Sequence, residues 1–248
     1  MSRIFLEICV DDAAGLDAAR AGGADRIELC AALALGGLTP SAGLMALAAR
    51  TGLPVMAMIR PRAGDFVWSP DDCAAMLAEI AAARAAGLAG VVIGASLPDG
   101  QLDAEVLAEQ VAAAKGMDIT LHRAIDLTPD PEQAMRLVAG LGIRRVLSSG
   151  GARTAHLGMA RLQAMARAAP DVRVMPGGGI SAANVADFAD ALRLRDIHAS
   201  ASAVLPEPAL TQVAAFGFQP PGARGTDAGL VRALRDRLDQ IGMSRPAG

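Results

Sequence analysis

The chain has 248 residues and a formal net charge of −3, and 52% of its residues are hydrophobic while only 2% are aromatic. A slight negative charge with so few aromatic rings argues against a nucleic-acid partner, because nucleic acids are bound by basic faces and by stacking on aromatic side chains. The apolar fraction is ample for one large core, which aliphatic residues and methionine must fill.

The sequence also bears on where the protein works. No apolar run approaches the roughly 20 residues that a membrane helix needs, which argues against a membrane partner. The N-terminal segment reaches acidic residues too early for a secretory signal. The three cysteines, Cys9, Cys30 and Cys73, are sparse and odd in number, which does not resemble a disulfide framework. We therefore expect a cytoplasmic protein whose thiols stay reduced.

Eight short apolar runs alternate with alanine-rich stretches of helical length. This alternation predicts a parallel sheet with helices packed against it. The predicted strands are 3–9, 25–30, 54–60, 89–94, 118–123, 144–148, 172–176 and 194–198. The predicted helices are 12–22, 40–51, 70–86, 103–115, 130–140, 154–169, 181–190 and 226–241.

The repeat of about 25 to 35 residues and the total length fit a single (β/α)8 barrel of the TIM type. An open doubly wound sheet is the alternative, since sequence alone does not prove that the sheet closes. We expect one barrel domain over residues 1–248, with an irregular, proline-rich loop at 199–225 that hangs over the site. The tail after Met243 is expected to fray.

Polar residues follow nearly every predicted strand, and the carboxyl ends of parallel strands form the ligand site of such folds. Alternation along a strand places Glu7 with Cys9, and Glu28 with Cys30, on the inward face of the first two strands. A buried glutamate is costly unless it is paired, and Arg60 on the third strand is the expected partner. The alternative interpretation is a purely structural network of ion pairs inside the barrel.

Two loops indicate an anion site at the same end. Gly177, Gly178 and Gly179 follow the seventh strand and lead into the predicted helix 181–190, and backbone N–H groups at such a helix start bind anions. Barrels often bind phosphate at this position. The loop with Ser149 after the sixth strand is a weaker version of the same pattern. The guanidinium groups at strand ends that suit phosphate or carboxylate belong to Arg60, Arg62 and Arg123.

Several stretches together resemble the CutC family, the copper homeostasis proteins. They are LEICVDD (6–12), GGADRIELCAALALGGLTPS (22–41), MIRPRAGDFVWS (58–69), GVVIGASLPDGQLD (90–103), HRAID (122–126), VLSSGG (146–151), PGGGI (176–180) and IHASA (197–201). They run through nearly the whole chain in order, and Trp68 and Ile125 stand where the family pattern has Tyr and Phe. The resemblance implies a TIM-like barrel, a cytoplasmic location and a role in copper handling.

Two functions from different classes stay open. In the first, the protein binds Cu(I), which prefers thiolate and thioether ligands. Cys9 and Cys30 then supply the thiolates, with Met58 or His122 as helpers. In the second, the protein is an enzyme that acts on a small anionic or phosphorylated metabolite by acid–base chemistry.

The enzyme hypothesis gives each polar residue a role. The candidate acids and bases are Glu7, Glu28, His122 and Asp126. The candidate anion-binding groups are Arg60, Arg62, Arg123, Ser149, Gly177, Gly178, Gly179 and His198. A variant places a divalent ion on Glu7, Glu28, His122 and His198, a set better suited to Zn or Mn than to Cu(I). The expected partner is thus a small anion or a metal ion, and homo-oligomer formation stays open.

Overall fold

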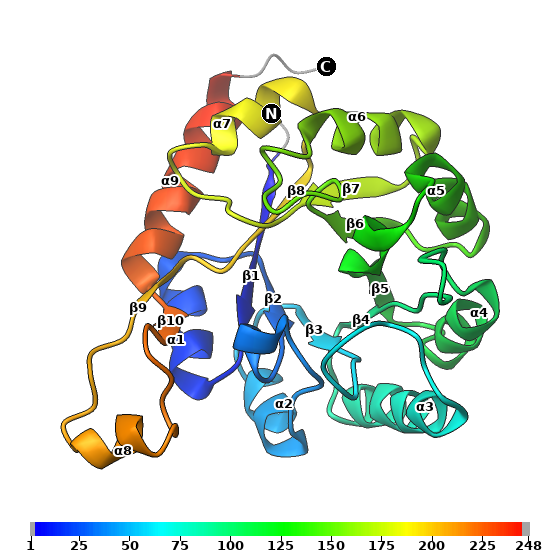
Figure 1. Cartoon of the computed structure of the whole chain (residues 1–248). Helices are drawn as coiled ribbons and strands as arrows, with labels where there is room; N and C mark the ends of the chain where they lie inside the picture. Colours follow the sequence, from blue (N-terminus) through cyan, green and yellow to red (C-terminus); the bar gives the residue numbers. More distant parts are fainter. Residues whose placement is uncertain (1–2, 245–248) are drawn as a thin grey trace.

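Eight parallel strands stand side by side in a ring, and helices cover the outside of this ring (Figure 1). The structure is a computed structural model that describes residues 3–244. The barrel strands are β1 (Phe5–Val10), β2 (Arg26–Leu29), β3 (Val55–Met58), β4 (Gly90–Ile93), β5 (Asp118–Leu121), β6 (Arg145–Ser148), β7 (Arg173–Pro176) and β8 (Asp196–Ala199). The helices around them are α1 (Ala13–Gly22), α2 (Ala42–Ala48), α3 (Pro70–Ala85), α4 (Ala104–Ala113), α5 (Pro131–Gly140), α6 (Met159–Ala168), α7 (Val185–Ala191) and α9 (Ala228–Ser244).

The sheet closes almost completely. Hydrogen-bonded ladders connect the strands in the order β7-β6-β5-β4-β3-β2-β1-β8, and β7 lies next to β8, although no ladder joins these two among residues 3–244. The predicted TIM-like (β/α)8 barrel is therefore confirmed, and the open doubly wound sheet is excluded. We call the β7–β8 contact the seam.

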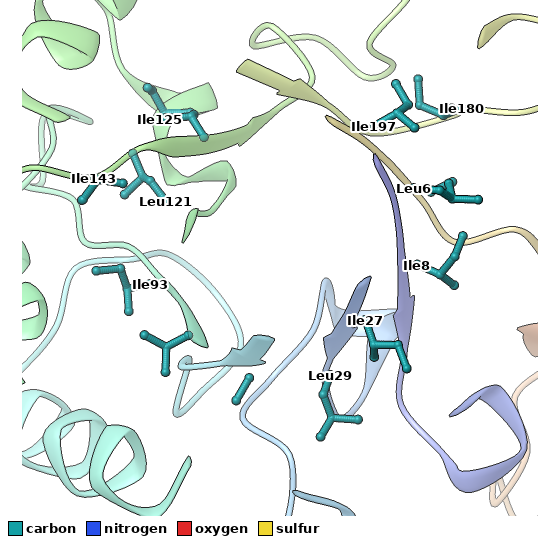
Figure 2. Close-up of a cluster of buried hydrophobic side chains, with 14 of the residues drawn as sticks. Leu6, Ile8, Ile27, Leu29, Ile93, Leu121, Ile125, Ile143, Ile180 and Ile197 are labelled. Atoms are coloured by element: carbon teal, nitrogen blue, oxygen red, sulfur yellow. The ribbon is translucent and has the colours of Figure 1, made fainter. Parts of the chain in front are cut away.

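Apolar side chains on the outer face of the strands form the main core. Leu6 and Ile8 of β1 are fully buried in this core, and so are Ile27 and Leu29 of β2. Figure 2 shows Leu6 and Ile8 on the side of β1 that faces away from the middle of the ring. Because side chains alternate along a strand, Glu7 and Cys9 then face the inside of the barrel, which carries the polar groups.

All eight predicted strands are present, but two helices begin four or five residues later than predicted. Helix α6 starts at Met159 and α7 at Val185, because the residues before them form loops that bind each other. The N–H of Ala155 donates to the carbonyl of Gly178 at 2.9 Å, which connects the loops after β6 and β7. This contact between distant segments has no local signal in the sequence.

The segment 199–225 is more regular than predicted. It contains β9 (Ser202–Val204) and α8 (Thr211–Ala215), and β10 (Arg224–Thr226) pairs antiparallel with β9. Most of this arm extends away from the barrel, with α8 at its tip (Figure 1). The arm does not cover the barrel mouth as a lid. Its base instead lines a cavity of about 630 Å³ that also contacts Cys9, Leu33 and Ser200.

Local capping signals fix several helix starts. Ser69 caps α3, and its side chain and that of Asp72 accept reciprocal backbone hydrogen bonds in a capping box. No helix within residues 3–244 is both long enough and apolar enough to span a membrane. The tail predicted to fray after Met243 lies mostly outside the described residues.

Candidate functional site

A cavity of about 250 Å³ opens at the carboxyl ends of the strands. Many of the predicted site residues line it, and they come from six different strands or the loops that follow them. The predicted residues in its wall are Cys9, Glu28, Arg60, His122, Arg123, Gly177, Gly178, Gly179 and His198. Glu7, Cys30, Arg62, Asp126 and Ser149 are not among the lining residues.

Strand register sets the polar centre of this site. Glu7 is paired in register with Arg26 on β2 and with His198 on β8, so the three side chains point into the barrel at one level. Glu7 Oε2 accepts a hydrogen bond of 2.5 Å from Arg26 Nε, and Glu7 Oε1 lies 2.8 Å from His198 Nδ1. Glu7 is fully buried, and its partner His198 lines the cavity. Glu7 therefore holds the imidazole ring of His198 by one nitrogen and leaves Nε2 for the cavity side.

The same ion pairs continue down the barrel to the seam. Arg26 Nη2 donates to Asp196 Oδ1 at 2.9 Å, and Arg173 Nη1 lies 3.4 Å from Asp196 Oδ2. Asp196 is fully buried. Charges of alternating sign thus run from Arg173 through Asp196, Arg26 and Glu7 to His198. We call this series the buried ion chain.

The predicted partnership between Arg60 and the two buried glutamates is wrong. Arg60 donates instead to the backbone carbonyls of Leu35, Gly37 and Gly64, at 2.8, 3.1 and 2.9 Å. The partner of Glu7 is Arg26, because it occupies the directly opposed register position on the neighbouring strand. Arg60 ties two loops together at the mouth.

Three potential metal ligands come together at the inner end of the cavity. The ligand atoms of Cys9, Glu28 and His198 all lie within 4.8 Å of one another, and the three residues are buried. Cys30 is not part of this group, but its thiol lies 3.7 Å from Glu28 Oε2 and donates to it. Glu28 therefore stands between the two cysteines that the sequence singled out.

Burial and neighbouring charges shift the pKa values of these groups in opposite directions. Burial alone raises the pKa of Glu7, but the Arg26 guanidinium and the hydrogen bond from His198 hold it at about 2. Burial raises the pKa of Glu28 above its usual value, and His198 only partly offsets this. Burial lowers the pKa of His198, yet Glu28 and Cys9 raise it well above the ordinary value. Glu7 is thus a permanent carboxylate, while Glu28 can carry a proton.

Three buried polar atoms of the cavity wall have no hydrogen-bond partner among the described residues. They are Glu28 Oε1, Arg60 Nε and His122 Nε2. His122 Nδ1 accepts from the N–H of Ala124 at 3.1 Å, so the neutral ring carries its proton on Nε2. Burial, and then the charge of Arg60, lower the pKa of His122 to about 3, which keeps this ring neutral. The cavity therefore presents two unused N–H donors and one unused carboxyl oxygen.

The glycine loop after β7 adds further donors. Gly178 and Gly179 adopt the left-handed region with φ of 102° and 74°, where glycine is strongly preferred. Their N–H groups have no acceptor within residues 3–244. The loop does not lead directly into a helix as predicted, because a turn at 181–184 precedes α7. Any anion binding here thus depends on these loop N–H groups and not on a helix start.

Asp126, Ser149 and Arg62 are engaged elsewhere. Asp126 accepts hydrogen bonds from Ser148, Ser149, the N–H of Gly151 and Arg123. Its pKa is lowered because these bonds outweigh burial. This arrangement anchors the loop after β6 beside the mouth. Arg62 binds Asp65 and Asp72 outside the cavity.

Residues that the sequence did not single out complete the site. Phe66 lines the cavity and packs against the ring of His122, with centroids 4.7 Å apart. Leu147 of β6 also lies in the cavity wall. Asp196 of the buried ion chain was also missed, although it stands two positions before His198, and strand alternation puts both on one face.

Comparisons with known proteins agree with this architecture. The CutC family model matches residues 4–203. The chain belongs to the CutC family. A CutC family protein of Rhizobium meliloti is 51% identical over 96% of this chain and 98% of its own length. A relative of the same description in Agrobacterium fabrum is 52% identical over 95% of this chain and 94% of its own length.

Solved structures support the fold. A Streptococcus agalactiae structure, described as a candidate copper homeostasis protein CutC, has a TM-score of 0.76 and 27% identity over 79% of this chain and 98% of that chain. An N-(5'-phosphoribosyl)anthranilate isomerase of Pyrococcus furiosus has a TM-score of 0.57 at 14% identity, over 96% and 99% of the two chains. This second likeness shows the barrel fold alone.

Proposed function

We propose that the mouth of this CutC family barrel binds Cu(I), with Cys9 as the principal ligand and His198 as the second. The observation that carries the proposal is the convergence of Cys9, Glu28 and His198 ligand atoms within 4.8 Å at the buried end of an open cavity. Cu(I) prefers soft thiolates and also accepts imidazole. Glu7, which binds the other ring nitrogen, fixes the orientation of His198, as carboxylates do for many metal-binding histidines.

Protons must leave as copper enters, because the ligands are a thiolate and a neutral imidazole. Glu28 lies next to Cys9 and is hydrogen-bonded to the thiol of Cys30. The raised pKa of Glu28 suits it to accept the proton that the Cys9 thiol releases when copper binds. The pKa of His198 is also raised, so its proton competes with copper. Cu(I) affinity is therefore expected to increase as the pH rises.

Single cysteine variants test the ligand set. We expect Cys9→Ser to lose high-affinity Cu(I) binding, measured by competition with a colorimetric Cu(I) chelator under anaerobic conditions. Cys30→Ser separates the two ligand sets: a comparable loss means that both thiols bind copper, and a small loss means that Cys30 only supports Glu28. Cys73→Ser is the matched control, since Cys73 lies on α3 away from the mouth. Unchanged affinity in Cys9→Ser contradicts the proposal.

A second candidate function, acid–base catalysis on a small anion, is favoured by the three unpartnered polar atoms. Copper at Cys9 and His198 leaves Arg60 Nε and His122 Nε2 without partners, and buried donors normally have one. The oxygen of a small carboxylate or phosphate would satisfy both donors and meet the free N–H groups of Gly178 and Gly179. Glu28 then serves as the proton donor, because its raised pKa favours the protonated form.

Thermal unfolding with inorganic phosphate and with malonate tests this second function. A ligand at a hundredfold excess over Kd stabilises the folded state by about 2.7 kcal/mol. We expect a higher melting temperature that His122→Phe abolishes, because the ring packing against Phe66 is kept and the N–H donor is removed. His156→Phe is the control, since His156 lies on the surface. An equal response of both variants contradicts the anion site at His122.

A further inference from the structure

A groove lined by arginines lies at the opposite end of the barrel from the mouth. It has a volume of about 600 Å³ and lies between α6 and α7, beside the amino ends of β7 and β8. The arginines that line it are Arg167, Arg173, Arg193 and Arg195. Its lining contains no aspartate or glutamate. Four positive charges therefore converge on one concave surface of a chain whose net charge is −3.

Most of this charge is unpaired. Arg173 lies 3.4 Å from the buried Asp196, whose other oxygen already binds Arg26. Arg167, Arg193 and Arg195 are exposed and form no ion pair with another described residue. Like charges gathered in a concavity repel one another, and an anion in the groove removes this repulsion. The groove floor is apolar, and Val172, Val174 and Leu192 contribute to it.

We propose that this groove is a second ligand site, for a small soluble compound that carries two linked phosphate groups and an apolar part. Guanidinium groups bind phosphate oxygens bidentately. A single phosphate carries a charge of about −1.5 to −2, which is less than the three unpaired guanidinium groups require. Two linked phosphates match the arginines, and an attached apolar ring packs on the floor. The volume lies within the usual range for small-molecule sites.

This site is separate from the mouth. The groove and the mouth cavity share no lining residue. The buried ion chain connects them, since Arg173 forms part of the groove and His198 part of the mouth. The proposal does not depend on copper or on the anion proposed at His122.

Titration with inorganic pyrophosphate at fixed ionic strength tests the site by calorimetry. We expect binding by the parent protein that is stronger than binding of inorganic phosphate. The double variant Arg193→Ala/Arg195→Ala removes two exposed side chains without ion pairs. It should weaken pyrophosphate binding at least about tenfold, and its free energy of unfolding should equal that of the parent protein. Arg167→Ala, on α6, should weaken binding in the same direction.

A charge-matched control separates this site from general attraction. Arg20→Ala/Arg136→Ala also removes two exposed arginines, from α1 and α5, and should bind pyrophosphate like the parent. ADP, which adds a ring to the two phosphates, should bind at least as well as pyrophosphate. Equal weakening in both double variants, unchanged binding in Arg193→Ala/Arg195→Ala, or no binding by the parent overturns the proposal.

Discussion

His122 illustrates how burial sets the chemistry of one side chain. Its ring is buried against Phe66 and near the charged Arg60, and both burial and this charge disfavour the imidazolium form. The pKa of about 3 means that the ring stays neutral at physiological pH. The hydrogen bond from Ala124 then directs the remaining N–H into the site. A donor that never changes its charge suits ligand recognition better than proton transfer, which leaves acid–base work to Glu28.

The lowered pKa of His122 predicts a pH-dependent loss of stability. A histidine whose folded pKa is depressed favours unfolding as the pH falls, from the unfolded value of 6.5 down to about 3. At pH 5 this group alone costs the parent protein about 2 kcal/mol relative to pH 7.5. The difference in unfolding free energy between the parent and His122→Phe should therefore shrink by about that amount, measured by urea titration at both pH values. A constant difference argues that His122 is protonated in the folded state.

Strand β4 shows how a short element positions the site through glycine. A Cβ atom at Gly94, just after β4, would lie 2.2 Å from the ring of His122. The indole N–H of Trp68 also donates to the Gly94 carbonyl at 2.9 Å. The end of β4 thus makes room for His122 and holds the loop that carries Phe66. The ends of β4 and β5 can approach this closely only because Gly94 has no side chain.

Adding a methyl group at this strand end should damage the site. We expect Gly94→Ala to lower the free energy of unfolding by about 1 to 3 kcal/mol, because the His122 ring must move. Gly140→Ala is the matched control: nothing lies within 4 Å of the added Cβ at the end of α5, so stability should stay equal or rise by up to about 1 kcal/mol. Urea unfolding gives the free energy of unfolding of both variants. Equal changes in the two variants would show that β4 can shift to accommodate the added methyl group.

Sequence patterns predicted elements better than the contacts between them. The eight strands were recognisable because apolar runs such as those around Ile8 and Ile93 stop at polar residues or glycine. The pairing of Glu7 with Arg26 was missed because it depends on register, which a single strand sequence does not state. The strands β9 and β10 were not predicted for a related reason. Each is three residues long, and each is stabilised by pairing with the other. The sequence thus predicted where the site lies, but it did not predict which side chains bind one another within it.

The whole barrel depends on how its seam is held. All other neighbouring strands are joined by backbone ladders, whereas β7 and β8 are joined in part by the ion pair of Arg173 and Asp196. Asp196 also holds Arg26 inside the barrel. A buried charge that loses its partner is strongly destabilising. The seam is thus the place where a small chemical change should affect the global stability most.

Neutralising Asp196 should therefore destabilise the entire molecule. We expect Asp196→Asn to lower the unfolding free energy by about 1 to 3 kcal/mol, because Arg26 keeps Glu7 but loses its second buried carboxylate. Glu132→Gln, which breaks an exposed pair with Arg136 on α5, should cost about 0.5 kcal/mol or less. Thermal unfolding distinguishes the two variants. Similar melting temperatures would mean that the seam does not depend on this carboxylate.

The alternating signs of the buried ion chain have a consequence for the kind of ion the mouth can accept. Cu(I) at Cys9 and His198 displaces two protons and brings one positive charge. Glu28 can retain one of those protons, so the total charge inside the barrel stays constant. A divalent ion on the same ligands keeps this balance only if both protons leave the interior, with no carboxyl group to hold one. The charge of the ion thus decides what Glu28 must do: a monovalent ion is balanced when Glu28 keeps one proton, and a divalent ion is balanced when Glu28 keeps none.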